Sequence, residues 1–369
     1  MQSPKEKSMP NNPNLDNPKI VITGPGEEGF SILELIVSMV VFLIVTGAIF
    51  GLLKIARESR SVVNEQVQLT RSVRVALNIV GRDTYNAGFA YPLRNTVILP
   101  DNRISTLLGI PNDFDTTRDT VPPIIAANNN TLNTFNPTPN TMTDQVTFLF
   151  KDSTFNLIGP AGSEVSQPLS INAATTNSGI DEIIPISGSN VACRINDIFL
   201  VTGNTGSALS LVTGLSGSNT VLFSNGDVLG FNQTGPGGTL RGITTPATMQ
   251  RVRMVTYFVT ANGIFTRRAF ANAPPTVPAV TSVDEPLVYG VENFQIQYIL
   301  NDGTVTDNPS AGPDGISGTM DDIQGNLAAV RQVRFTINVR STDLNNSGQY
   351  YRITQTATFS TRNLGYDAN

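Results

Sequence analysis

The strongest hydrophobic pattern in the chain is an uncharged apolar run near its N-terminus, from Leu35 to Leu53. A helix over these residues rises about 28 Å at 1.5 Å per residue, close to the roughly 30 Å of a bilayer's hydrocarbon core. Gly47 and Gly51 lie one turn apart in this run, a spacing that lets two helices approach closely. The run is longer than the apolar part of a secretory signal and lacks its small-residue exit. The pattern therefore predicts one membrane-spanning helix over 35–53.

A narrower apolar stripe continues the helical pattern beyond this segment. Its members recur at intervals of seven, seven, four, three and four residues: Ile55, Val62, Leu69, Val73, Ala76 and Val80. Such spacing is typical of an amphipathic helix that packs one face against a partner. Gly88 is suited to end the helix, because glycine readily adopts the left-handed conformation of many helix ends. We therefore expect a long helix over 30–88, with a membrane half at 35–53 and an amphipathic half at 54–87.

Alternation with a period of two residues replaces the helical pattern in the rest of the chain and predicts β-strands. The expected strands are 144–151, 197–202, 220–231, 252–260, 264–270, 294–300, 333–340 and 350–360. Asn262-Gly263 lies between two of them and is a strong hairpin signal. Residues 152–189 are interpreted as a long loop or an insertion. The predicted fold class is α+β, with the long helix packed against a C-terminal antiparallel sheet domain that carries long loops.

The amino-acid composition excludes several classes of functional site but says less about the fold. Only 14% of the 369 residues are charged, and 31 are glycine, which favours a β-rich extracytoplasmic domain. The chain has no histidine and one cysteine, Cys193, which excludes Ser-His-Asp triads, His-ligated zinc and intramolecular disulfides. It also lacks a phosphate-binding loop of the nucleotide-hydrolase type. The net charge of -5 gives no clear nucleic-acid signal. We therefore predict that the protein is not an enzyme. Cys193 is expected to be a small buried residue, and the Arg267-Arg268 pair is expected to lie at a solvated strand end.

One charge stands at the edge of the apolar run, on Glu34. A carboxylate at membrane depth is costly and usually has a partner with a functional role, yet the sequence shows no obvious partner within the chain. A cut after Gly29 would create a positively charged amine on Phe30, four residues before Glu34. The same amine on a neighbouring copy is a natural counter-ion for the carboxylate.

The segment Gly29-Phe30-Ser31-Ile32-Leu33-Glu34-Leu35 resembles the prepilin peptidase site of type IV pilins and of type II secretion pseudopilins. The resemblance implies that residues 1–29 are a leader, that the chain is cut between Gly29 and Phe30, and that Phe30 is N-methylated. It assigns subunit assembly to Glu34, at the fifth mature position. It also implies a single pass through the inner membrane, an extracytoplasmic β-rich domain over 89–369, and later exposure on a pilus or the cell surface. The implied partners are other pilins and minor pilins, the prepilin peptidase and the inner-membrane assembly platform.

The order of several weaker motifs is similar to that of PilW-like minor pilins. These motifs are Gly81-Arg82-Asp83, Ala87-Gly88-Phe89, Tyr257-Phe258-Val259, Arg267-Arg268, Leu287 to Glu292, and Val330 to Ser341. The expected function is a minor type IV pilin that takes part in pilus initiation or assembly. The J-type pseudopilin of type II secretion shares much of this plan and is the alternative. A more remote alternative is a membrane-anchored extracytoplasmic enzyme or calcium-dependent binding module.

An acidic, glycine-rich segment between two expected strands is a candidate calcium site. Its carboxylates are Asp302, Asp307, Asp314, Asp321 and Asp322. Calcium prefers several oxygen ligands on a flexible loop, although this spacing is not that of an EF-hand. The alternative is a solvated polar turn. No cofactor is required by the expected function, so calcium would be an additional ligand.

Overall fold

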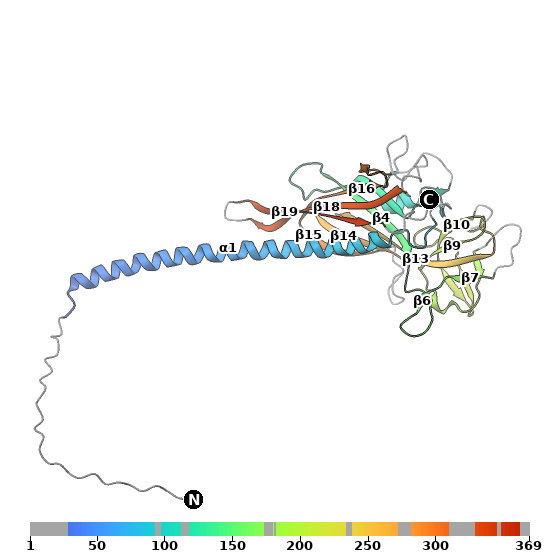
Figure 1. The fold of residues 1–369 in the computed structure, drawn as a ribbon, viewed down its shortest axis with the longest axis horizontal. Coiled ribbons are helices and arrows are strands. Elements are labelled where there is room, and N and C mark those ends of the chain that lie inside the picture. Colours follow the sequence, from blue (N-terminus) through green and yellow to red (C-terminus); the bar gives the residue numbers. More distant parts are fainter. Residues whose placement is uncertain are drawn as a thin grey trace, which may run out of the picture. The chain divides into compact units, whose positions relative to one another are not determined.

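The computed structural model describes residues 29–92, 97–111, 118–172, 180, 182–233, 238–271, 282–309, 329–344 and 348–361. Its contacts divide the chain into two compact units, Met1–Ser61 and Val62–Asn369. Helix α1 (Ile32–Asn86) begins in the first unit and ends in the second, and β-strands are the main regular structure of the second unit (Figure 1). One long N-terminal apolar helix and a large sheet region confirm the predicted α+β class.

In the first unit, the side chains of α1 are exposed along the predicted membrane segment. Within the described residues, α1 is the one helix long and apolar enough to cross a membrane. No residue of its most apolar stretch is buried. The large apolar residues on all sides of this segment are exposed to solvent; Phe42 and Leu52, for example, are each 67% exposed. A helix that is apolar all round needs an apolar environment, because water solvates such a surface poorly.

The second unit is organised by strand β13 (Ala247–Val259), which has four partner strands. Its first half pairs with β7 (Leu169–Ile171) and β9 (Ile198–Thr202), and its second half pairs with β4 (Met142–Lys151) and β14 (Ile264–Phe270). These strands belong to a ten-stranded sheet of order β15-β14-β13-β9-β10-β1-β2, with β3, β4 and β7 off this path. The remaining members are β1 (Val97–Leu99), β2 (Asp119–Thr120), β3 (Ile124–Leu132), β10 (Ser207–Leu211) and β15 (Ser282–Tyr289).

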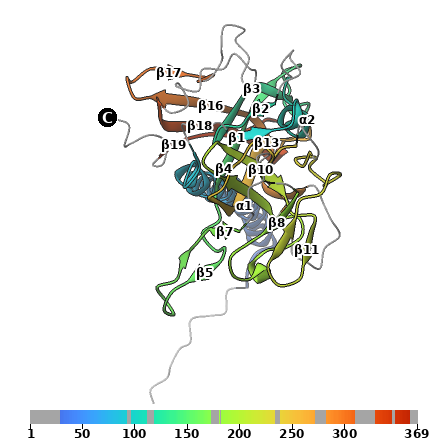
Figure 2. The same cartoon turned by 90° about the vertical axis from the view of Figure 1, so that its right-hand side faces the viewer.

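Three smaller sheets and two short helices complete this unit. The four-stranded sheet has the order β17-β16-β18-β19 and contains β16 (Val291–Leu300), β17 (Val305–Thr306), β18 (Val330–Leu344) and β19 (Tyr350–Ser360). The others contain β8 (Ile183–Pro185), β11 (Gly214–Ser216) and β12 (Thr220–Leu222), and the pair β5 (Leu157–Ile158) and β6 (Val165–Ser166). The short helices are α2 (Arg103–Leu108) and η1 (Asn190–Ala192). Figure 2 shows the four-stranded sheet on one side of the unit and β5, β8 and β11 on the opposite side.

The first hydrophobic core lies between the amphipathic half of α1 and the strands of two sheets. The predicted stripe residues Val73, Ala76 and Val80 are fully buried there, Leu69 is partly buried, and Leu77 widens the stripe. A run of aromatic rings crosses this core with neighbouring centroids 4.7–6.1 Å apart, the range in which rings attract one another. Its members, in order, are Phe148, Tyr257, Phe265, Phe294, Phe335 and Phe359.

Gly81 lets the last ring of this run lie directly against α1. A Cβ at Gly81 would collide with three atoms of the Phe359 ring on β19. Glycine costs helix stability in an interior turn, so its presence here is explained by the close approach of the ring.

Two further cores occupy other parts of the unit, and β13 contributes to all three. Its Tyr257 lies in the first core, its Met254 in the second and its Met249 in the third. Along β10, Leu209 and Leu211 lie in the second core, whereas Ala208 lies in the third. This alternation follows from the two-residue period of a strand.

Most of the expected strands are present with small shifts of their ends. The hairpin at Asn262-Gly263 is confirmed, since it joins β13 to β14 and Gly263 has a φ of 72°. Residues 152–189 contain the short strands β5, β6, β7 and β8 where a loop or insertion was expected. The strand predicted over 220–231 was wrong beyond Leu222. The Asp227 carboxylate accepts backbone N–H bonds from Leu229, Phe231 and Asn232 at 2.9–3.2 Å, and so holds this stretch in a turn.

Candidate functional site

The segment predicted to carry the function forms the first turn of α1. The Ser31 N–H donates to Oε2 of Glu34 at 3.3 Å, and the Glu34 N–H donates to Oγ of Ser31 at 3.2 Å. This reciprocal arrangement is a capping box, which satisfies two helix-start donors that would otherwise have no partner. Glu34 therefore does have a partner within the chain, contrary to the sequence interpretation. The spacing Ser-x-x-Glu was the signal that could have revealed it.

The peptide bond between Gly29 and Phe30 lies before the first helical residue. The Phe30 side chain is 85% exposed, and both residues are outside the helical hydrogen-bond ladder. A bond in this position is accessible to another protein without unwinding of the helix. The acidic group of Glu34 and the start of the apolar surface follow within the next turn.

A second group of candidate residues joins α1 to the ten-stranded sheet. Asp83 is 2% exposed, and its Oδ2 accepts hydrogen bonds from Tyr257 Oη at 2.6 Å and from Arg267 Nε at 3.0 Å. Arg267 also donates from Nη1 to Glu285 Oε2 at 2.9 Å. Burial, together with the negative charge of Asp83, raises the pKa of Tyr257, so its hydroxyl stays a donor. For Arg267, burial acts to lower the pKa, but Asp83 outweighs it and the net shift is upward.

The expectation that Arg267 and Arg268 form a solvated strand end was wrong for Arg267. That residue is only 9% exposed, because it points toward α1 and the buried Asp83. Its neighbour Arg268 points the other way and forms a bidentate pair with Asp284 at 2.6 and 2.8 Å, with the two side chains 33% and 45% exposed. Adjacent residues of one strand face opposite sides, and the two arginines follow this rule.

A third group joins β16 to the β18–β19 pair. The Glu292 side chain is 9% exposed and accepts two hydrogen bonds from Arg352, at 2.8 and 3.0 Å. Arg340 Nη1 lies 3.5 Å from the same carboxylate, and its guanidinium lies over the ring of Phe135 with 3.9 Å to the centroid. Five of the six weaker motifs thus contribute a residue to two clusters, one around Asp83 and one around Glu292, whereas Ala87-Gly88-Phe89 contributes to neither. In both, the charged groups bond one another and hold elements together.

A pocket of 570 Å³ lies beside the Asp83 cluster and is lined by residues of both signs. Its charged groups already have partners: Arg253 Nε lies 3.3 Å from Asp152 Oδ2, and Lys151 Nζ donates to the Ser166 carbonyl at 2.7 Å. Burial lowers the pKa of Lys151. This arrangement can stabilise the corner between α1 and β13 but presents little charge to a ligand.

The predicted calcium loop is described only at its start. Asp302 Oδ1 accepts the Thr304 N–H at 2.9 Å, which closes a turn and lowers the pKa of this carboxylate. Asp307 follows strand β17, whereas Asp314, Asp321 and Asp322 lie outside the described residues. Among the residues that the structure describes, no three carboxylate, cysteine or histidine side chains are grouped to hold a metal ion. Calcium binding therefore stays a prediction.

The single cysteine is buried, as predicted. Burial and the nearby Asp197 raise the pKa of Cys193 to about 12, and Arg251 opposes this shift. The thiol is therefore protonated at neutral pH and is a poor nucleophile.

Comparison of the chain with protein-family models, with curated proteins and with solved structures gives no significant match. The motif at the start of α1 and the geometry around it are therefore the basis for a functional proposal.

Proposed function

We propose that this chain is a minor pilin, a structural subunit that is processed by a prepilin peptidase and takes part in the initiation or assembly of a type IV pilus. One combination of features carries the proposal. The Gly29-Phe30 motif and Glu34 stand at the start of a helix whose first part is apolar and exposed, and whose second part packs into a β-rich unit. In this reading, the exposed part of α1 anchors the precursor in the inner membrane and later packs against other subunits.

The capping box lowers the cost of placing the Glu34 carboxylate at the edge of the membrane before another subunit binds it. One hydrogen bond with Ser31 gives Oε2 of the carboxylate a donor, and the other gives the Glu34 N–H at the helix start an acceptor. Cleavage before Phe30 leaves Ser31 in place, so the box can survive processing. The new amine of one subunit can then approach Glu34 of another, where a charge-assisted hydrogen bond is stronger than the neutral type. A buried pair with one partner missing is strongly unfavourable, so this contact favours one register between subunits.

Two substitutions separate assembly from capping. Glu34→Gln keeps a side chain that can complete a capping box, but it removes the charge. Ser31→Ala removes one half of the box and keeps the carboxylate. We expect both variants to insert into the membrane of a pilus-forming cell and to be cleaved before Phe30. Only Glu34→Gln should be depleted from filaments sheared off the cells.

The measurements are the mass of the mature N-terminus, expected to be N-methyl-Phe30, and the amount of the chain in the sheared filament fraction. Glu58→Gln is the matched control, because it neutralises a carboxylate of the same helix beyond the apolar segment. Normal incorporation of Glu34→Gln would show that the charge has no role in assembly. A chain that keeps its leader in cells with an active prepilin peptidase would refute the proposal itself.

A further inference from the structure

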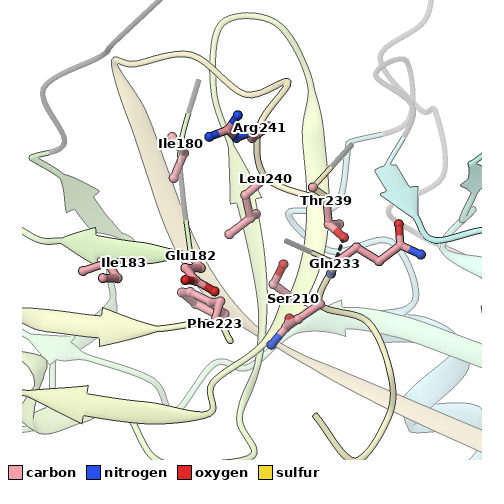
Figure 3. Close-up of a pocket in the computed structure, with 11 residues that line it drawn as sticks. Ile180, Glu182, Ile183, Ser210, Phe223, Gln233, Thr239, Leu240 and Arg241 are labelled. Carbon is pink, nitrogen blue, oxygen red and sulfur yellow. Dashed lines mark hydrogen bonds between the residues drawn. The ribbon is translucent and has the colours of Figure 1, made fainter. Parts of the chain in front are cut away.

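A pocket beside the third core of the second unit has features of a ligand site that the assembly function does not use. It has a volume of 420 Å³, within the usual range for small-molecule sites. Figure 3 shows its described walls, which come from Ile180, Glu182 and Ile183, from Ser210 on β10, from Phe223, and from residues 232–233 and 238–241. Ile180, Phe223 and Leu240 supply apolar surface, and all three belong to the third core.

Ser210 supplies the observation that points to a ligand. Its side chain lines the pocket and is 1% exposed, yet its Oγ has no hydrogen-bond partner among the residues that the structure describes. It lies on the same side of β10 as Ala208, toward the third core, where the neighbours are apolar. A buried hydroxyl without a partner is unfavourable and rare. A polar atom of a bound molecule would remove this cost.

Two other polar residues of the pocket already form hydrogen bonds within the chain, and these bonds fix the shape of the pocket. Asn232 Nδ2 donates to the carbonyls of Leu211 and Ser224, and its Oδ1 accepts the Leu211 N–H. Thr239 Oγ1 donates to the Phe231 carbonyl and accepts the Gln233 N–H. These bonds tie the wall of the pocket to strand β10, so the position of the Ser210 hydroxyl is set before any ligand arrives.

The charges at the pocket indicate the class of ligand. Among its described lining residues, Glu182 and Arg241 carry charges of opposite sign, and Gln233 adds an exposed amide (Figure 3). These described residues together carry no net charge that would attract a phosphate, a nucleotide or a polycation. They offer hydroxyl, amide and carboxylate groups to neutral hydroxyls, and the side chains of Ile180 and Leu240 to a C–H surface. Sugars combine these two kinds of surface.

We propose that this pocket binds a small neutral saccharide, one or two sugar units in size, with the Ser210 hydroxyl bonded to a sugar hydroxyl. This site does not depend on cleavage or on Glu34. A loss of assembly therefore leaves it intact, and a loss of sugar binding leaves assembly intact.

The test uses the full chain in micelles of a detergent without a sugar headgroup, because a glycosidic detergent would compete for the site. Glucose, galactose, mannose, N-acetylglucosamine and their common disaccharides are screened by saturation-transfer NMR, and Kd is measured for each sugar that binds. Ser210→Ala should weaken binding about tenfold, the equivalent of one hydrogen bond. Its melting temperature should be unchanged or higher, because the substitution removes an unpaired buried hydroxyl.

Ser207→Ala is the matched control on the same strand. Ser207 is also buried, but its Oγ donates to Thr202 Oγ1 at 3.1 Å, so its loss should lower the melting temperature and leave sugar affinity unchanged. Gln233→Ala, at an exposed position, should weaken binding without changing stability. The proposal is overturned if no sugar binds the unmodified chain at millimolar concentration, or if Ser210→Ala binds as well as the unmodified chain. Preferential binding of inorganic phosphate or of free amino acids would also overturn it.

Discussion

The buried carboxylate of Asp83 on α1 should contribute far more to stability than the exposed carboxylate of Asp284 on β15. Asp83→Ala removes the acceptor of Tyr257 Oη and of Arg267 Nε, which bond it at 2.6 and 3.0 Å. Arg267 would keep Glu285, whose side chain is 52% exposed, as its remaining counter-charge. The substitution therefore leaves a buried hydroxyl without its acceptor and a buried cation only partly compensated.

The magnitude follows from burial. Removing one partner of a buried ion pair costs about 3–5 kcal/mol, and the remaining Glu285 places our expectation at the lower end, about 3 kcal/mol. Asp83→Asn keeps one acceptor oxygen and should cost about half as much. The control is Asp284→Ala, which breaks the exposed pair with Arg268. Arg268 directly follows Arg267 on β14. Exposed pairs are worth about 1 kcal/mol or less.

The assay is equilibrium urea unfolding of the full chain in micelles, followed by circular dichroism, with m-values compared between variants. If Asp83→Ala and Asp284→Ala destabilise the protein equally, the buried cluster does not contribute as we argue. A changed m-value with an unchanged midpoint would likewise contradict the reasoning, because it would indicate a change in surface exposure instead of a lost interaction.

Three further predictions concern other buried groups. Burial raises the pKa of Asp144 to about 6, although the N–H groups of Asn129 and Ile296 oppose the shift. The unfolded value is about 3.9, so the folded state gains its proton first on acidification, and the protein should be about 1 kcal/mol more stable at pH 5 than at pH 7. Asp144→Asn should flatten this difference in urea titrations at the two pH values, and lower stability at pH 5 in the unmodified chain would contradict the prediction. Cys193 should react with a maleimide only after denaturation, as measured by mass shift; rapid labelling of the native chain would show that the thiol is not buried. Gly81→Val should cost about 1–3 kcal/mol by overpacking against Phe359, and Phe359→Ala should remove most of that cost in a double-mutant cycle, whereas additive effects would exclude the contact.

The hydrophobic pattern predicted those parts of the fold in which burial follows a simple period. Val73, Ala76 and Val80 were found because a helix buries every third or fourth residue, and the C-terminal strands were found because their faces alternate. Leu77 was missed because the sheets cover a wider arc of α1 than the narrow stripe suggested. The turn at Asp227 was missed because a side chain that bonds several backbone N–H groups leaves no periodic signal.

The candidate site was predictable where its chemistry is local. Glu34 was identified from its position, and its capping bonds were readable from the three-residue spacing to Ser31. The role of Arg267 was not readable, because its partner Asp83 lies 184 residues earlier in the chain. The pocket around Ser210 was equally hidden, since a lone serine in a strand becomes informative only when its neighbours are known to be apolar.

The central position of strand β13 determines how the second unit unfolds. Because it supplies side chains to all three cores and pairs with strands on both sides at both ends, no core can melt while the others keep their native edge. The unit should denature as one cooperative body.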